Sequence, residues 1–117
     1  AWGTGSPLRE FLHVEDMASA SVFLMNKDSD SYNSKVLPTM SHLNVGCGKE
    51  TSIKDLAETI ASVVGFEGKI IWDSSKPDGT PRKLMNSKAI NSLGWQSKIE
   101  LPKGLESTYE SFKRNFN

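Results

Sequence analysis

Apolar side chains recur every three or four residues in two long stretches of the chain, which predicts two amphipathic helices. The first runs from about Val14 to Asn26. Its predicted buried face carries Val14, Met17, Ala18, Ser21, Leu24 and Met25. The second helix is bounded by a capping box of Ser52 and Asp55 and by Gly65, which can adopt the left-handed conformation that ends a helix.

Two further helices are predicted near the C-terminus. A short one spans Ser87 to Gly94, and Trp95 is expected to fold back on Ile90. The last begins at Leu101 with a proline in its first turn. Its predicted inner face carries Leu101, Leu105, Thr108, Phe112 and Phe116. Both helices are expected to pack against the rest of the chain.

Three short runs predict strands, at residues 11–14, 41–45 and 69–72. Residues 27–35 are polar and predict a mobile surface loop. The expected fold is therefore a small α/β domain of about three short strands and four helices. The 117 residues fit a single domain with a modest core, and they are few for an enzyme that must hold both a dinucleotide and a substrate.

Charge and composition exclude several classes of function. Lys plus Arg and Asp plus Glu both number 14, so nothing indicates binding to nucleic acid or to an anionic membrane. The sequence has no signal peptide and no run of 18 apolar residues. Cys47 is the only cysteine and cannot form an internal disulfide, so a reducing, cytoplasmic location is expected.

Residues 73–83 form the stretch with the most suggestive chemistry. They follow the predicted strand 69–72, so they are expected to leave the end of a sheet, where sites in α/β domains often lie. Two prolines and an Asp-Gly pair favour a stiff turn. With Asp78, Arg82 and Lys83 the loop suits a ligand that carries hydroxyl groups and phosphate. The alternative is a solvated turn that only links a strand to a helix.

The first ten residues hold two more candidates. Trp2 lies beside glycines, and Arg9 follows seven residues later. An indole can stack on a planar ring, and a guanidinium can pair with an anion. The alternative is that Trp2 packs down as a lid on the core while Arg9 stays in water.

Four other patterns are interpreted as structural. Gly46-x-Gly48 resembles part of a dinucleotide fingerprint, but Thr51 replaces the third glycine, so a tight strand-to-helix turn is favoured. Cys47 and His13 have no catalytic partner at a suitable spacing. Tyr109-x-x-x-Lys113 has the spacing used by short-chain dehydrogenases, but any amphipathic helix produces it readily.

Three motifs carry a resemblance to a known family. They are Trp2-Gly-x-Gly-x-Pro-Leu-Arg-Glu-Phe-Leu-His-Val-Glu-Asp-Met-Ala18, then Asn44-Val-Gly-x-Gly48, and then Lys76-Pro-Asp-Gly-Thr-Pro-Arg-Lys-Leu84. Together they resemble the C-terminal part of the GDP-L-fucose synthases, which are extended short-chain dehydrogenases. The first motif is shared in looser form by many nucleotide-sugar epimerases and dehydratases. The third is much closer to the fucose synthases alone.

The resemblance implies a site and a role. Trp2, Arg9 and Asp78 fall on substrate-binding positions, and Lys83 is a further contact to the GDP diphosphate. The family converts GDP-4-keto-6-deoxy-D-mannose to GDP-L-fucose by epimerisation and reduction with NADPH. Its cofactor loop, its catalytic Ser/Tyr/Lys set and its proton-transferring Cys and His lie in the N-terminal portion, which this chain is expected to lack.

The chain alone is therefore expected to hold no NADP, to be inactive and to bind GDP-sugar weakly. It is also expected to self-associate through apolar surface that a cofactor domain would cover. Two other functions remain open. One is the corresponding part of a UDP- or dTDP-sugar epimerase or dehydratase. The other is a non-enzymatic binding or scaffold module.

Overall fold

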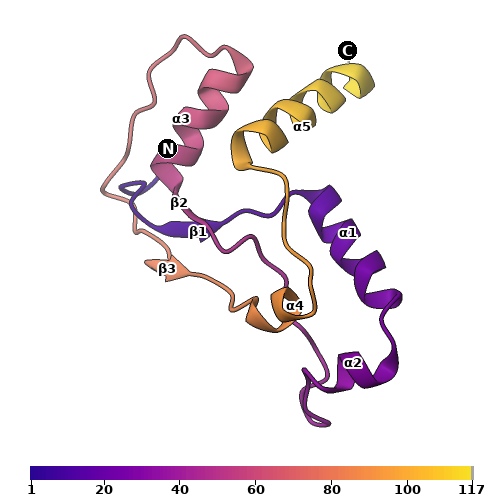
Figure 1. The fold of residues 1–117 in the computed structure, drawn as a ribbon. Helices are drawn as coiled ribbons and strands as arrows, with labels where there is room; N and C mark the ends of the chain where they lie inside the picture. The colour runs from indigo at the N-terminus through magenta and orange to yellow at the C-terminus, as the bar shows by residue number, and fades with distance from the viewer. Residues whose placement is uncertain (117) are drawn as a thin grey trace.

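The computed structural model describes residues 1–116, which form three short strands and five helices (Figure 1). In chain order these are β1 (Leu8–Glu10), α1 (Val14–Met25), α2 (Ser29–Asn33), β2 (Glu50–Ser52), α3 (Ile53–Val64), β3 (Arg82–Lys83), α4 (Lys88–Ser92) and α5 (Leu101–Phe116). The small α/β class is confirmed, with one helix more than expected. The extra helix, α2, lies where the sequence predicted a loop, and the Asp28 carboxylate caps it by accepting a hydrogen bond from the Ser31 amide at 2.8 Å.

The sheet has the order β2-β1-β3, with β1 antiparallel to β2 and parallel to β3. All three predicted strand positions are wrong, because residues 11–14, 41–45 and 69–72 do not form strands. Each true strand is only two or three residues long and is defined by a partner far away in sequence. A local apolar run carries no information about whether such a partner lies beside it.

The helices follow the local signals closely. Ser52 accepts a hydrogen bond from the Asp55 amide at 2.9 Å, and its hydroxyl donates to the Asp55 carboxylate at 2.7 Å, so the predicted pair caps α3. Gly65 ends α3 at φ 71°. Helix α5 begins at Leu101 as predicted. Capping and periodicity are local properties, which is why the sequence predicts them well.

The predicted buried face of α1 is only partly buried, since Leu24 packs against the core but most of its other members do not. Asp16 and Ala20 are buried, whereas Val14, Met17 and Met25 of the predicted face are exposed. The Asp16 carboxylate is only 4% exposed and accepts hydrogen bonds from the backbone amides of residues 98 and 99. This polar contact turns the apolar stripe of α1 outward.

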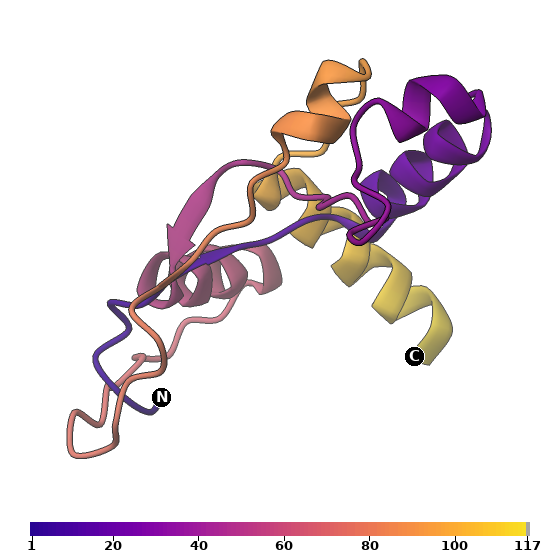
Figure 2. The ribbon, with the colours of Figure 1, turned by 90° about the horizontal axis from the view of Figure 1, so that it is seen from below.

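The core lies between α1 and α4, which Figure 2 shows side by side. Its fully enclosed members are Ala20, Ile90 and Trp95, and the partly buried Leu12, Phe23, Leu24 and Val45 pack against them. Trp95 folds back on Ile90 as predicted, and its indole N–H donates to the Ser19 hydroxyl at 3.0 Å. The Ser87 hydroxyl, predicted to cap α4, makes no capping bond.

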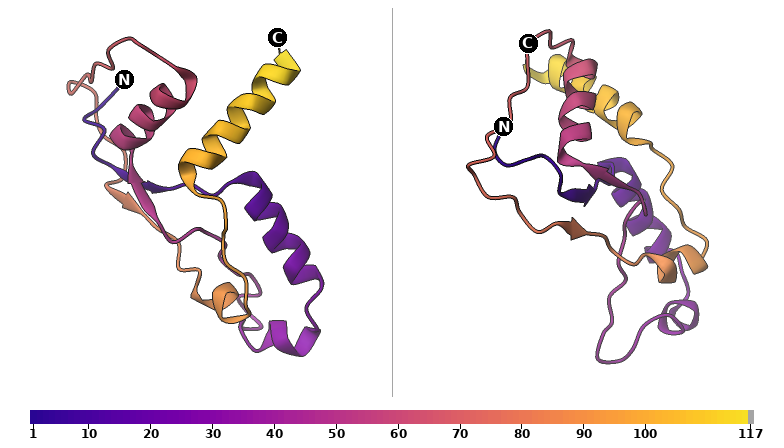
Figure 3. Two further views of the ribbon diagram at one scale, coloured as in Figure 1. Left: turned by 45° about the horizontal axis from the view of Figure 1, so that its top comes forward. Right: turned by 90° about the vertical axis from the view of Figure 1, so that its left-hand side faces the viewer.

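The chain is open and flat. Its radius of gyration is 17.5 Å, whereas a compact chain of this length has about 13 Å. It exposes 8477 Å², about a third more than the ~6,300 Å² of a compact protein of this mass. Helices α3 and α5 both stand on one side of the sheet (Figure 3), and Phe112 and Phe116 of the predicted inner face of α5 are exposed. Within residues 1–116, no helix is long and apolar enough to cross a membrane.

Candidate substrate-binding site

Two segments far apart in sequence lie side by side at the N-terminal end of the structure (Figure 1). Trp2 and Asp73 form a parallel bridge, in which the Gly3 amide donates to the Asp73 carbonyl at 2.9 Å. Further along, β1 pairs with β3. Between these two points, residues 73–81 run beside residues 2–8, and the loop predicted to carry ligand chemistry therefore faces the first ten residues.

A small cavity of about 110 Å³ lies between the two segments. Three of the four predicted site residues, Trp2, Arg9 and Asp78, are in its wall. The rest of the wall consists of Gly5, Pro7, Ile53, Pro77 and Gly79. Sites for whole small ligands usually measure about 300–1,000 Å³, so this cavity has room for only part of a nucleotide sugar.

Trp2 offers an open aromatic face at this cavity. Its side chain is 79% exposed, so the alternative of a lid packed on the core is wrong. The Lys76 ammonium lies 5.8 Å from the centre of the indole, within the range of a cation–π contact. The exposed indole is free to stack on a planar ring.

Arg9 lies half-buried on β1 beside the cavity. One of its terminal nitrogens donates to the Leu8 carbonyl at 2.6 Å. The other lies against Gly79, where an added Cβ would be 3.1 Å away. Within residues 1–116, Arg9 takes part in none of the ion pairs. Its charge therefore remains available for an anion.

Asp78 is held from the opposite side of the cavity by Thr4. The Thr4 amide donates to one carboxylate oxygen at 2.8 Å, and the Thr4 hydroxyl donates to the other at 2.6 Å. These hydrogen bonds favour the charged form and lower the pKa of Asp78 below its ordinary value. Asp78 is an anion at neutral pH, and part of its accepting capacity is already used within the protein.

Lys83 lies outside the cavity wall but close to it. It is the register partner of Arg9 across the β1–β3 ladder, so both side chains project from the same face of the sheet. Arg82, the other cation of the loop, forms three hydrogen bonds at 2.6–2.9 Å with the Glu50 carboxylate on β2. Glu50 thus ties Arg82 across the sheet, whereas Arg9 and Lys83 take part in none of the ion pairs within residues 1–116.

The sequence is similar to a defined group of enzymes. The NAD dependent epimerase/dehydratase family matches residues 1–46. GDP-L-fucose synthase 1 of Arabidopsis thaliana is 53% identical over 114 residues, which are 97% of this chain and 32% of that protein. GDP-L-fucose synthase of Escherichia coli is 49% identical, over 97% of this chain and 36% of its own length. The chain matches the C-terminal third of the GDP-L-fucose synthases.

A solved structure supports the same relationship. A GDP-D-glycero-L-gluco-heptose synthase from Campylobacter jejuni, determined in the presence of NADPH, has a TM-score of 0.84 and 35% identity. The match covers 97% of this chain and 32% of that one. The predicted resemblance to the GDP-L-fucose synthases and the predicted fold class are therefore confirmed. NADPH was present in that solved structure, in agreement with the cofactor that the resemblance implied for the whole enzymes.

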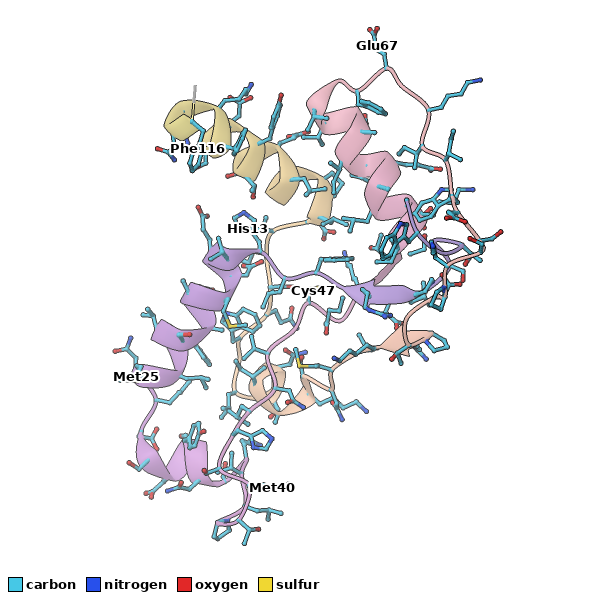
Figure 4. The ribbon with its side chains drawn as sticks, turned by 180° about the vertical axis from the view of Figure 1, so that it is seen from behind. His13, Met25, Met40, Cys47, Glu67 and Phe116 are labelled. Carbon is cyan, nitrogen blue, oxygen red and sulfur yellow. The ribbon has the colours of Figure 1, made fainter. Side chains whose placement is uncertain are left out.

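The patterns interpreted as structural have structural partners. The His13 ring caps α1 by accepting from the Glu15 amide at 3.3 Å, and its position beside α5 is seen in Figure 4. The Cys47 thiol, labelled in the same view, donates to the Phe11 carbonyl at 3.3 Å. The Lys113 ammonium pairs with Glu110.

The partial dinucleotide fingerprint also fails as a cofactor site. A strand should precede the glycines, but β2 follows them and runs directly into α3. Instead, the Gly48 amide donates to the Glu10 carboxylate at 2.6 Å, and Gly46 packs against the same side chain. Gly46 allows the close approach of residues 46–48 to β1, whereas Gly48, at φ 73°, provides the left-handed backbone of the turn.

Larger hollows occur elsewhere in the described chain. One of about 630 Å³ lies beside Cys47, and one of about 440 Å³ lies between α3 and α5. The walls of both lack all four predicted site residues. The cavity of about 110 Å³ is the better candidate, because the unpaired guanidinium of Arg9 and the exposed indole of Trp2 meet there. Within residues 1–116, no cluster of His, Cys, Asp and Glu could hold a metal ion.

Sequence reasoning missed two residues of this site. Thr4 holds both oxygens of Asp78, and Lys76 lies over the indole of Trp2. Both stand inside the motifs that carried the resemblance, but their contacts join positions about 74 residues apart in the chain. No local sequence pattern predicts a contact between residues so far apart.

Proposed function

We propose that this chain is the nucleotide-sugar-binding part of a GDP-L-fucose synthase and that residues 1–117 form a single domain with that role. The observation that carries the proposal is the meeting of Trp2, Arg9 and Asp78 around one cavity. The ligand is GDP-4-keto-6-deoxy-D-mannose or its product, GDP-L-fucose. The relatives that support this choice are about three times as long as this chain.

Each residue has a distinct part in this proposal. Trp2 stacks on a flat part of the ligand, and Arg9 forks onto the diphosphate. Lys83 adds a second positive charge from the neighbouring strand. Asp78 accepts hydrogen bonds from ligand hydroxyl or ring N–H groups through the lone pairs that Thr4 leaves unused. The small cavity encloses only a part of the ligand, which agrees with weak binding.

The first experiment is a titration of the chain with GDP followed by nuclear magnetic resonance. We expect the signals of the Trp2 indole N–H and of the Asp78 and Gly79 amides to shift. Because a hydrogen bond to a charged group contributes about 1.5–3 kcal/mol, Arg9→Gln should weaken binding about tenfold or more. Arg9→Lys should recover part of the loss. Arg114→Gln, an exposed arginine on α5, is the matched control and should bind like the unaltered chain.

The second experiment tests which nucleotide is recognised. A thermal-shift series with GDP, UDP and dTDP should show the largest rise in melting temperature with GDP. A preference for UDP or dTDP would assign the chain to another nucleotide-sugar enzyme. If none of the three nucleotides raises the melting temperature, and none moves the NMR signals of Trp2, Asp78 or Gly79, a binding or scaffold module with no sugar ligand would be favoured instead.

The reaction of the whole enzyme is part of the same proposal. It consists of epimerisation at two carbons beside the ketone, by proton removal and return, and then hydride transfer from NADPH to the ketone. Residues 1–117 alone are proposed to be inactive, because the resemblance assigns the NADP-binding domain and the catalytic Ser/Tyr/Lys set to the N-terminal portion of the family, outside the part that these residues match. Incubating it with GDP-4-keto-6-deoxy-D-mannose and NADPH should give no NADPH oxidation above the blank.

Self-association is proposed through the exposed apolar stripe of α1 and the end of α5. Val14, Phe112 and Phe116 border one hollow, and Met25 at the end of the stripe is 86% exposed. The exposed area exceeds that of a compact chain by about 2,000 Å², more than the ~800 Å² that each partner buries in a stable interface. Sedimentation should show a dimer that Val14→Lys dissociates.

Met40→Lys is the control for self-association, because Met40 is also exposed but lies outside this stripe. A monomer at every concentration would contradict self-association.

The reducing cytoplasm is the proposed location, since Cys47 carries a free thiol.

A further inference from the structure

The Thr4 side chain is the centre of a hydrogen-bonded chain at the candidate site. Its hydroxyl donates to one oxygen of Asp78 at 2.6 Å, while its amide donates to the other at 2.8 Å. Two bonds from one residue to both oxygens fix the plane of the carboxylate as well as its position. Hydrogen bonds to a charged acceptor are also among the stronger ones in proteins.

The direction of each hydrogen bond in this chain can be assigned. A hydroxyl has a single proton, and that of Thr4 is given to Asp78. The contact of 2.7 Å between the Thr4 and Ser6 hydroxyls must therefore be donated by Ser6. The Ser6 amide donates to the same Thr4 oxygen at 3.2 Å. The Thr4 hydroxyl has its proton and both lone pairs in use, so it has no capacity left for a ligand.

The hydrogen bonds from Thr4 are the ones that join the tip of the loop to the rest of the fold. Among the hydrogen bonds within residues 1–116, those from Thr4 alone join residues 74–80 to a residue outside the loop. The loop is otherwise tied at its two ends, at Asp73 and at Pro81. Gly79, the residue after Asp78, lies against the Arg9 guanidinium. Any movement of Asp78 would therefore change the surroundings of Arg9.

We propose that Thr4 is the positioning residue of this site, which holds Asp78 and with it residues 77–79 against Arg9. It acts through Asp78 and does not touch the ligand itself. This inference rests on the proposed function, because the ligand whose binding it supports is the GDP group.

The test uses the 117-residue chain and three substitutions. Thr4→Val keeps the shape and removes the hydroxyl, Thr4→Ser restores the hydroxyl, and Thr59→Val is a matched control on α3 that lies outside the site. Without ligand, the heteronuclear NOE of the Asp78 and Gly79 amides should fall in Thr4→Val and return in Thr4→Ser. On titration with GDP, Thr4→Val should bind about five- to tenfold more weakly, and Thr4→Ser within twofold of the unaltered chain.

Each outcome decides a different question. Unchanged loop order in Thr4→Val overturns the inference, and so does a looser loop that binds GDP with unaltered affinity. If the unaltered chain does not bind GDP, the proposed function is wrong, and so is the role of Thr4 in ligand binding. The heteronuclear NOE of the loop would still show whether Thr4 holds Asp78.

The amide signals of α5 report whether each variant is folded. If Thr4→Val does not fold, Ser6→Ala removes one donor to Thr4 and should weaken GDP binding about twofold. No change in Ser6→Ala overturns the proposed hydroxyl chain.

Discussion

Replacing Asp16 should destabilise the protein more than any exposed acidic substitution. Its buried carboxylate accepts from the Lys98 amide at 3.1 Å and from the Ile99 amide at 2.9 Å. Asp16→Ala leaves two backbone N–H groups without their partner. Each such group costs about 1–3 kcal/mol, and because water can reach part of the exposed segment, about 2–3 kcal/mol in total is expected. This is a large share of the stability of a domain with so small a core.

Thermal unfolding followed by circular dichroism measures this loss. A cost of that size should lower the melting temperature by about 10 °C in a chain of this length. Asp16→Asn keeps one accepting oxygen and should lose about half as much. Glu15→Gln, its exposed neighbour, should change the melting temperature by about 2 °C or less. If Asp16→Ala melts within about 2 °C of the unaltered chain, the account of the buried face of α1 is wrong.

Two further predictions concern the sheet and the candidate site. Gly3 has φ 78°, and a Cβ there would overlap the Asp78 carboxylate, so Gly3→Ala should weaken GDP binding. Gly48 has a similar φ of 73° but open space around it, so Gly48→Ala should leave GDP binding unchanged. Titration of both variants with GDP measures the difference. Arg82 hydrogen-bonds to Glu50 and lowers the pKa of Glu50 below its ordinary value of 4.5. The pair therefore stabilises the protein above pH 4.5, and this contribution is lost as the pH falls below that value. Urea unfolding at pH 6 and pH 3 should show a smaller difference for Arg82→Gln than for the unaltered chain.

The sequence predicted the helices well and the strands poorly, for a physical reason. The capping of α3 by Ser52 and its end at Gly65 depend on neighbours within a few residues. The ladder between β1 and β3 joins positions more than 70 residues apart and is only two residues long. Ile71 belongs to an apolar run that predicted a buried strand, but its side chain is 75% exposed. The segment next to it pairs only with the extended chain at Trp2.

The orientation of α1 was also beyond local reasoning. Its apolar stripe predicted a buried face, but the Asp16 carboxylate is buried instead and accepts hydrogen bonds from the backbone amides of Lys98 and Ile99, just before α5. At the site, a resemblance pointed to Trp2, Arg9 and Asp78, and the structure places all three in one cavity wall. The part of Thr4 depends on a contact across the fold, which a single sequence does not encode in any short pattern.

The enclosed core and the cavity at Trp2 have no residue in common. The core holds α1 to α4, whereas the cavity is assembled by hydrogen bonds between two extended segments. A substitution at Ile90 should therefore lower the melting temperature of the free chain while leaving the affinity for GDP unchanged. Screening variants by thermal stability alone would miss substitutions that damage only the cavity.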